Sequence, residues 1–472
     1  MSNKEPTQTD RSRRNFLKGA TGAVVAGVSA SAFSGIAQAG EQKINWGSQG
    51  LGSKNDRQFW RKVQKQFVLD KKTTYMNIGT TGSMPKHVLE NYADNNKLVA
   101  EYPWDMQGKF GSWPQVTNMA EEIAAGFGAD AEEIILSRNT TDGLCTIING
   151  LHFEKGDVIL TTHHEHVAAL SPLSVAKERF NAEVVEIQLP VFTGTEEVSE
   201  EDYVEAFRTA IESNGNVRLI VFSHITYKTG TALPAKAICE LAKEYRIPTM
   251  IDGAHTIGML NLDFHDLDCD FYAGSGHKWQ CGAGATGILY VRKGENSLGE
   301  RLNEYWQREN PLWLINSSLS HADYLGKQIQ LQYVGNDNFP AKQALTDSCK
   351  MWDEIGRDRI EERVLALGSL CKELLAKALP QAKIFSPNVE GLTSGLTTFN
   401  PFFDNVTNGD ILTEFRDRLR EEYGYIIRTT NFKLYKDDLD DTYALRISTH
   451  LFHDEQDVEG LVQAITDLYY SF

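Results

Sequence analysis

A lysine and an aspartate lie among small residues in the middle of the chain. Lys278 follows residues 274–277 (Gly-Ser-Gly-His) and precedes a glycine-rich run at 282–287, whereas Asp252 ends a short apolar segment and precedes residues 253–255 (Gly-Ala-His). Small neighbours leave room for a flat ligand over the lysine amine, and a carboxylate at a strand end can reach a pyridinium nitrogen. The pair therefore predicts a Schiff base between Lys278 and pyridoxal phosphate (PLP), with a solvated turn lysine as the alternative.

Short apolar segments alternate with amphipathic ones between residues 131 and 292. This pattern predicts strands at 134–136, 158–161, 184–187, 219–222 and 249–251, and helices at 167–180 and 235–245. Such alternation is typical of an α/β fold with a mostly parallel sheet and helices on both faces. Because ligands bind beyond the carboxyl ends of the strands of such sheets, ligand-binding residues should follow strands.

Hydroxyl-bearing residues follow two of these strands. Thr140 and Thr141 open a helix after the strand at 134–136, where free backbone N–H groups and hydroxyls can bind a phosphate. A plain helix N-cap is the alternative for these threonines. Tyr227 follows the strand at 219–222 and is predicted to hydrogen-bond the phenolic oxygen of the cofactor, unless it belongs to a simple polar loop.

Three histidines and a glutamate follow the strand at 158–161. Imidazoles and a carboxylate can bind zinc, so His163, Glu165 and His166 would be the ligands of a metallohydrolase. Adjacent residues on a strand point in opposite directions, however, so at most two of these side chains can converge. No metal site is therefore predicted, and His166 is predicted to stack on a flat ring.

After residue 292 the sequence predicts a second, smaller α+β region. Helices are expected at 341–355 and 455–468, and strands at 396–399, 425–428 and 444–448. Arg446 lies within the last of these apolar strands. A buried arginine costs free energy unless it is paired, so a substrate carboxylate is its predicted partner, with a structural ion pair as the alternative.

Length, composition and charge limit the class of protein. The 472 residues, 41% hydrophobic and 24% charged, suffice for one large domain and a smaller one, and the net charge of −17 disfavours nucleic acid and anionic membranes as partners. The six cysteines lack CxxC spacing, so most are expected to be buried free thiols. Cys281, three residues beyond Lys278, is the candidate for a reactive thiol.

The first 39 residues predict an export signal of the twin-arginine type. Residues 12–18 contain Arg13 and Arg14, a weakly apolar stretch follows at 19–36, and residues 37–39 (Ala-Gln-Ala) form a small-x-small cleavage site. A disordered basic tail is the alternative. Cleavage near Ala39 would leave no membrane anchor and would place the mature protein in the periplasm, after contact with the twin-arginine export machinery.

Five motifs resemble, in order, those of class V aminotransferase-fold enzymes. These PLP-dependent enzymes of fold type I include cysteine desulfurases and isopenicillin N epimerase. The resemblance covers the chain from about Tyr75 to its C-terminus. The matching motifs are Thr140-Thr141-Asp142, Glu165-His166, Asp252-Gly253-Ala254-His255, Ser275-Gly276-His277-Lys278 and Arg446.

The resemblance implies a role for each matching residue around the cofactor ring. Lys278 would hold the cofactor covalently and Asp252 would contact the ring nitrogen. His255 would lie near the phenolic oxygen, where many relatives have glutamine. Ala254 and His166 would pack on opposite faces of the ring.

Further matching residues imply contacts with the phosphate and with the substrate. Thr141, Ser275 and His277 resemble phosphate ligands, and Arg446 resembles the residue that binds the substrate α-carboxylate. Gly335 and Asn336 match a segment that reaches the phosphate of a partner subunit in relatives, although threonine is usual where this chain has Asn336. The resemblance therefore implies a homodimer.

Two departures place the chain nearer the isopenicillin N epimerase-like branch. Desulfurases carry a mobile cysteine shortly after the position of Arg428, but residues 429–435 contain none. Tyr227 replaces the asparagine that is common in desulfurases. Arg428 itself is retained as a predicted substrate-binding residue. The branch also contains exported enzymes that act on siderophore peptides.

The sequence as a whole predicts an exported PLP-dependent enzyme that acts at Cα of an amino acid or peptide amine. A transaminase-type reaction is favoured. Epimerisation, racemisation or oxidative decarboxylation of a peptide such as a siderophore precursor are alternatives, a cysteine desulfurase is less favoured, and an inactive binding protein is the non-enzymatic alternative. The predicted parts are the signal at 1–39, an N-terminal arm at 40–94, a large PLP-binding domain at 95–335 and a small domain at 336–472.

Overall fold

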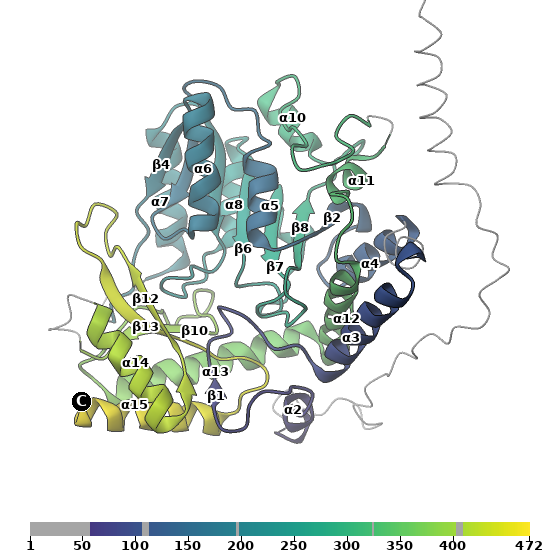
Figure 1. The fold of residues 1–472 in the computed structure, drawn as a ribbon. Coiled ribbons are helices and arrows are strands. Elements are labelled where there is room, and N and C mark those ends of the chain that lie inside the picture. The colour runs from purple at the N-terminus through teal and green to yellow at the C-terminus, as the bar shows by residue number, and fades with distance from the viewer. Residues whose placement is uncertain (1–56, 106–112, 195–197, 323–324, 403–408) are drawn as a thin grey trace, which may run out of the picture. The chain divides into compact units, whose positions relative to one another are not determined.

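A computed structural model describes residues 57–105, 113–194, 198–322, 325–402 and 409–472 (Figure 1). All of these lie within one compact unit, Trp46–Phe472. The predicted signal at 1–39 and the start of the predicted arm lie outside the described residues and stay predictions, as does the domain boundary at 335. No helix in the described part of the chain has the length and apolar character needed to cross a membrane.

A seven-stranded sheet forms the centre of the fold, with the strand order β2-β8-β7-β6-β5-β3-β4 (Figure 1). Strand β8 runs antiparallel to β2 and β7, and the other neighbouring strands pair in parallel, so the prediction of an α/β fold with a mostly parallel sheet is confirmed. The strands are β2 Ile134–Ser137, β3 Val158–Thr162, β4 Glu183–Ile187, β5 Val217–Ser223, β6 Thr249–Gly253, β7 Phe271–Ser275 and β8 Gly287–Val291.

Both faces of this sheet are covered because its strands are apolar on both sides. Consecutive residues of β5, such as Ile220 and Val221, point to opposite faces and belong to two different buried clusters. One cluster includes α4 (Trp113–Ala125), α7 (Glu200–Ser213) and α8 (Ala235–Glu244), and the other includes α5 (Thr140–Ile148), α6 (Val167–Phe180) and α10 (Glu300–Trp306). Strands buried on both faces are typical of parallel sheets.

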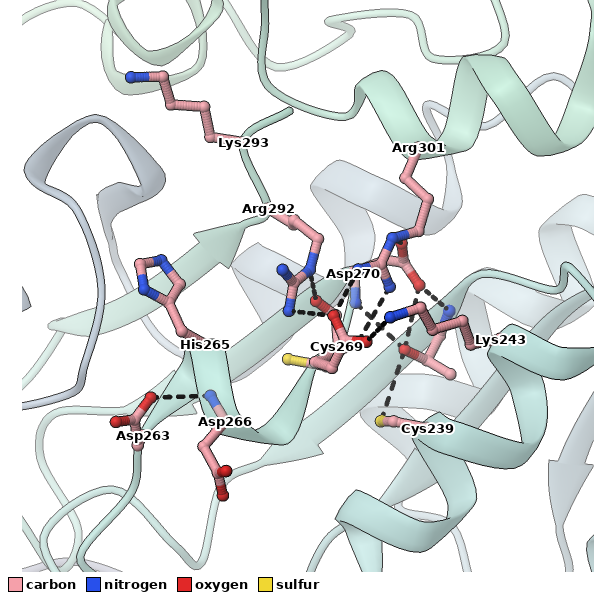
Figure 2. Close-up of polar contacts among 12 residues, drawn as sticks. Cys239, Lys243, Asp263, His265, Asp266, Cys269, Asp270, Arg292, Lys293 and Arg301 are labelled. Atoms are coloured by element: carbon pink, nitrogen blue, oxygen red, sulfur yellow. Dashed lines mark hydrogen bonds and ion pairs between the residues drawn. The ribbon is translucent and has the colours of Figure 1, made fainter. Parts of the chain in front are cut away.

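A charged network lies at the edge of the sheet where the parallel strands begin. Arg292 and Arg301 both pair with Asp268, at 2.8 and 2.5 Å, and Arg301 also pairs with Asp270 at 3.5 Å. Asp270 accepts a hydrogen bond from the backbone N–H of Thr249, at the start of β6. Figure 2 shows Asp270, Arg292 and Arg301 together at this edge.

A four-stranded antiparallel sheet of order β12-β13-β10-β9 forms the smaller region. Its strands are β9 Lys383–Ile384, β10 Leu396–Asn400, β12 Arg428–Phe432 and β13 Thr442–Ser448. Helices α13 (Arg357–Ala378), α14 (Gly409–Tyr423) and α15 (Glu455–Ser471) share one buried apolar cluster with it.

The predicted single strand at 425–428 is wrong. Residues of β11 (Tyr425–Ile426) pair in parallel with β1 (Thr74–Tyr75) in a separate two-stranded sheet, and β12 begins only at Arg428. The backbone N–H of Met76 donates to Ile426 at 2.9 Å, so a segment distant in sequence supplies the partner of β11. Local apolar pattern could not reveal that partner.

The remaining helices connect these regions. Phe59 and Trp60, within the predicted N-terminal arm at 40–94, are buried in α2. The other elements are α2 Arg57–Gln64, α3 Lys86–Glu101, α9 Phe264–Leu267, α11 Lys327–Gln332, α12 Phe339–Ile355, and two 3-10 helices, η1 Pro103–Asp105 and η3 Ala131–Glu133.

All six cysteines are free thiols, and all but Cys145 are buried. The proposal that Cys281 is reactive is wrong. Its side chain is fully buried, and burial raises the pKa of the Cys281 thiol to about 12. Since the thiolate is the reactive form, Cys281 is an inert core residue.

Candidate active site

A cavity of about 270 Å³ lies where the parallel strands end, at the edge of the sheet opposite the charged network. All the sequence-predicted site residues line it except Gly335, Asn336 and Arg446. The lining residues are Gly79, Thr80, Asn139, Thr140, Thr141, His166, Ala168, Ser223, Ile225, Tyr227, Asp252, Ala254, His255, Ser275, His277, Lys278 and Arg428.

Lys278 and Asp252 reach this cavity from neighbouring strands. Asp252 lies in β6, opposite Ala273 of β7, and Lys278 follows the end of β7. Burial raises the pKa of Asp252, whose Oδ1 accepts a hydrogen bond from the backbone N–H of Ala254 at 2.9 Å. Burial lowers the pKa of Lys278 to about 8, although Asp252 opposes the shift. The amine is therefore available as a neutral nucleophile near neutral pH.

The glycines around Lys278 have a different purpose from the one predicted. A Cβ on Gly274 would lie 2.1 Å from Ile257 Cγ1, and one on Gly276 would lie 2.6 Å from Thr286 Oγ1. These glycines therefore make room for protein side chains and not for a flat ligand.

The start of α5 and the end of β7 form a cradle for an anion. Asn139 caps the helix by accepting a hydrogen bond from the backbone N–H of Asp142 at 2.8 Å. The hydroxyls of Thr140 and Ser275 lie 2.7 Å apart, and Thr141 also lines the cavity. First-turn N–H groups and hydroxyls at the positive end of a helix suit a phosphate.

Three histidines, His166, His255 and His277, line the cavity, and burial lowers the pKa of each. His166 caps α6, its Nδ1 accepts from the backbone N–H of Ala168 at 3.1 Å, and burial lowers its pKa to about 4. Burial also lowers the pKa of His255, whose Nδ1 accepts from Trp279 Nε1 at 3.2 Å. The hydrogen-bond network thus assigns the proton of His255 to Nε2, which can donate to an oxyanion.

Arg446 lies directly behind the cavity wall and is not neutralised. Its side chain is 1% exposed, its Nη1 donates to the Tyr227 carbonyl at 3.0 Å, and its Nε and Nη2 have no hydrogen-bond partner among the described residues. A Cβ on Gly79, which lines the cavity, would lie 2.9 Å from Arg446 Nη2. Only a glycine therefore leaves this guanidinium close to the cavity.

Arg428 increases the positive charge beside Arg446. The two arginines are directly opposite each other on β12 and β13, an arrangement that is unfavourable for like charges. Burial and then Arg428 lower the pKa of Arg446 to about 9. A buried guanidinium with two unpaired nitrogens and a cationic neighbour favours the binding of a carboxylate.

Sequence reasoning missed a buried glutamate below the cavity. Glu165 accepts hydrogen bonds from Ser223 Oγ and Thr162 Oγ1, both at 2.6 Å, and burial raises its pKa to about 7. The sequence identifies Glu165 as a possible metal ligand and as part of the Glu165-His166 motif, but indicates no role for it at the cofactor. His163 instead lies 3.3 Å from Gln188, so His163, Glu165 and His166 have separate partners and do not form a ligand set.

Gly335 and Asn336 lie outside the cavity in the single chain. Gly335 adopts a φ of 96°, a conformation that favours glycine, and a Cβ there would meet nothing within 4 Å. Their predicted contact with the phosphate of a partner subunit stays a prediction.

Comparison with known proteins identifies the family. The family model for class V aminotransferases matches residues 74–461, so the chain belongs to the class V aminotransferase family. Isopenicillin N epimerase from Amycolatopsis lactamdurans is 26% identical over 420 residues, covering 87% of this chain and 98% of that protein. The enzyme of the same name from Streptomyces clavuligerus is 25% identical over 414 residues, covering 87% and 98%.

Solved structures of PLP enzymes share the fold. The cystine C–S lyase C-DES in complex with cysteine persulfide superposes with a TM-score of 0.66 at 21% identity, covering 84% of this chain and 98% of that one. A cysteine desulfurase from Escherichia coli gives a TM-score of 0.65 at 20% identity, covering 88% and 99%. The chain is thus a PLP-dependent enzyme of fold type I.

The chemistry of the cavity residues fits PLP. The cradle of Thr140 and Ser275 can take the phosphate, Asp252 can bind a ring N–H, and Lys278 provides an amine for the aldehyde. The unpaired nitrogens of Arg446 remain for the carboxylate of a substrate. The donor set therefore matches the cofactor without a metal ligand set in the cavity.

Proposed function

We propose that the protein is an exported enzyme that uses PLP to react at Cα of an amino acid or peptide amine, in a transaminase-type reaction. The observation that carries this proposal is the placement of Lys278 and Asp252 in one cavity close to Arg446, whose Nε and Nη2 have no hydrogen-bond partner among the described residues. The amine and acid suit the cofactor, and the arginine suits a substrate carboxylate.

The bound cofactor supplies an electron sink for a pair of electrons released at Cα. The protein provides the positioning. Arg446, assisted by Arg428, holds the substrate carboxylate and so decides which bond of Cα is aligned for cleavage. Asp252 would hold a proton on the ring nitrogen, because a nearby carboxylate favours the protonated, cationic form of the ring.

Lys278 is the proposed general base. Its lowered pKa of about 8 lets Nζ accept the Cα proton and return it at a neighbouring carbon. Delivery by one amine on one side of the substrate supports transamination. His166, which lines the same cavity, is a poor proton donor, because burial lowers its pKa to about 4.

Epimerisation is the second candidate, and the relatives named isopenicillin N epimerase favour it. That reaction requires proton transfer on both faces of Cα, and Lys278 is the only strong base lining the described cavity. Cysteine desulfuration is disfavoured because the segment after Arg428 lacks a cysteine. Other relatives are named cysteine desulfurase or desulfhydrase, which keeps this reaction among those to be assayed.

Export and assembly belong to the same proposal. The motif at residues 12–39 supports passage through the twin-arginine machinery into the periplasm, since this route carries folded proteins that already contain a cofactor. We propose a homodimer in which Gly335 and Asn336 approach the phosphate of the partner subunit. Cell fractionation tests the location, and sedimentation of the mature protein tests the dimer.

The reaction type is tested by incubating the PLP-loaded mature protein with amino acids and peptides in deuterated water. Transamination predicts conversion of the cofactor to its pyridoxamine form and release of a keto product. Deuterium at Cα of a recovered, inverted amine without net loss of the amino group would contradict transamination and establish epimerisation. Absence of both, with the Lys278→Ala variant behaving like the parent, would leave the inactive binding protein as the better account.

A further inference from the structure

A second cavity, of about 430 Å³, adjoins the first one and has a basic wall. We call it the basic pocket and define it by Arg416, Arg420 and Arg428 with Asp417. Arg428 and Thr80 line both cavities, and Arg428 Nη1 donates to Thr80 Oγ1 at 3.2 Å between them. A ligand that occupies the first cavity can therefore extend past Arg428 into the basic pocket.

The charge of this pocket is opposite to that of the protein. Three guanidiniums face the single carboxylate of Asp417, although the chain carries a net charge of −17. Arg416 is held by Asp417 through its Nε and Nη2, at 2.9 and 2.7 Å. Arg420 is exposed, and its side chain has no hydrogen-bond or ion-pair partner among the described residues. Asp417 bonds to Arg416 instead.

The placement of Arg416 and Arg420 is unfavourable for the helix by itself. They are four residues apart on α14, so like charges meet on one face and lower helix stability by about 0.2 to 0.5 kcal/mol. Arg418 of the same helix, in contrast, pairs with Glu422 at 2.6 Å. At the pocket, by comparison, Asp417 pairs among the described residues with Arg416 alone, so the lining keeps an excess of positive charge.

The lining also suits an aliphatic chain that ends in an acid. Ile426 and Ile427 contribute apolar surface next to the arginines. The planar fork of arginine matches the two oxygens of a carboxylate better than a lysine would. We propose that the substrate carries a second carboxylate, beyond the one bound by Arg446, and that the basic pocket binds it. This inference rests on the proposed function for the reacting amine.

The first experiment compares matched acid and amide substrates in single turnovers of the PLP-loaded mature protein. The pairs are L-glutamate with L-glutamine and L-alanyl-L-glutamate with L-alanyl-L-glutamine. The expected result is at least tenfold higher kcat/KM for the acid of one pair, the size of one charged hydrogen bond of about 1.5 kcal/mol. In the R416Q/R420Q variant the preference for the acid should disappear because KM for the acid rises, whereas kcat for the amide should stay unchanged.

The control is Arg418→Gln, which removes an arginine of the same helix that points to Glu422. It should keep the preference for the acid. A parent enzyme without preference, or a double variant that retains it, would overturn the proposal. The single variant Arg420→Gln, at an exposed position, gives the same test if the double variant does not fold.

A second experiment separates this inference from the proposed function. Glutarate, which has two carboxylates and no amine, is titrated into the PLP-free protein by calorimetry. Binding that weakens about tenfold in R416Q/R420Q but not in Arg418→Gln supports the pocket even if no substrate reacts. If no pair reacts and glutarate either fails to bind or binds all variants equally, the arginines are solvated surface residues and the inference is wrong.

Discussion

The buried charged side chains at the two edges of the central sheet differ in whether they have partners of opposite charge. At the edge where the parallel strands begin, burial opposes ionisation of Asp268, but Lys243 and Arg301 outweigh burial and lower its pKa. Burial likewise opposes the charge of Arg301, but Asp270 and Asp268 outweigh burial and raise its pKa. At the edge where the parallel strands end, Arg446 is buried with two nitrogens that have no partner in the described part of the chain, and burial lowers its pKa to about 9.

This difference separates stabilising charges from functional ones. Removing one member of a buried pair leaves its partner uncompensated and destabilises the fold, whereas an unpaired buried charge costs stability until a ligand neutralises it. Arginines and acids occur at both edges, so residue type alone does not identify the site. Matched substitutions at the two edges test the distinction.

The largest contrast is expected between Asp252→Asn and Asp268→Asn. Loss of the Asp252 charge should lower kcat about 10³-fold, because an amide cannot hold the proton of the cofactor ring. The PLP-free variant should be no less stable than the parent, since burial already disfavours the charge. Asp268→Asn should keep kcat but lose about 3 kcal/mol of unfolding free energy, because Arg292 and Arg301 lose the carboxylate that they share. Turnover assays and urea unfolding measure both effects, and equal loss of stability in the two variants would refute the contrast.

A smaller contrast is expected between Arg446→Gln and Arg301→Gln. Arg446→Gln should lower kcat/KM about 10²-fold, because it removes a charged hydrogen-bond donor from the substrate carboxylate. Its PLP-free form should be as stable as the parent or more so. Arg301→Gln should unfold at lower urea concentration with unchanged kcat/KM. Steady-state kinetics of a reactive amine substrate provide the measurement, and an Arg446 variant with normal kcat/KM would contradict the assignment.

The smallest effect is expected for Glu165→Gln and depends on pH. The folded pKa of Glu165, about 7, exceeds its ordinary value of 4.5, so the folded protein holds a proton that the unfolded chain releases. Between these values the contribution of Glu165 to stability falls as pH rises. Relative to the parent, the PLP-free variant should therefore gain about 1 to 3 kcal/mol between pH 4.5 and pH 7. Urea unfolding at several pH values checks this, and a difference that does not change with pH would show that Glu165 is ionised throughout.

Much of the fold was predictable because its strands and helices have regular apolar patterns. The predicted helix at 167–180 has the bounds of α6, and the segments at 134–136 and 249–251 fall within β2 and β6. The pairing of β11 with β1 was not predictable, since it joins segments about 350 residues apart. Cys281 was misjudged for a similar reason: closeness to Lys278 in sequence says nothing of burial.

Site residues could be predicted from the sequence only where they follow a predicted strand or belong to a recognisable motif. Asp252 and Lys278 met both conditions, and both line the cavity. The closeness of Arg428 to Arg446 depends on the register of β12 and β13, which the sequence does not show. The unpaired state of Arg446 likewise requires a complete list of its neighbours, which only the folded chain provides.

The most direct test of the account is to locate the cofactor on the protein. Borohydride reduction of the PLP-loaded protein, followed by digestion and mass spectrometry, fixes and identifies the lysine that holds PLP. The account predicts the modification on Lys278 and its absence in Lys278→Ala. Modification of another lysine, such as Lys228, whose Nζ donates to the Asn431 carbonyl at 2.6 Å, or of none, would contradict it.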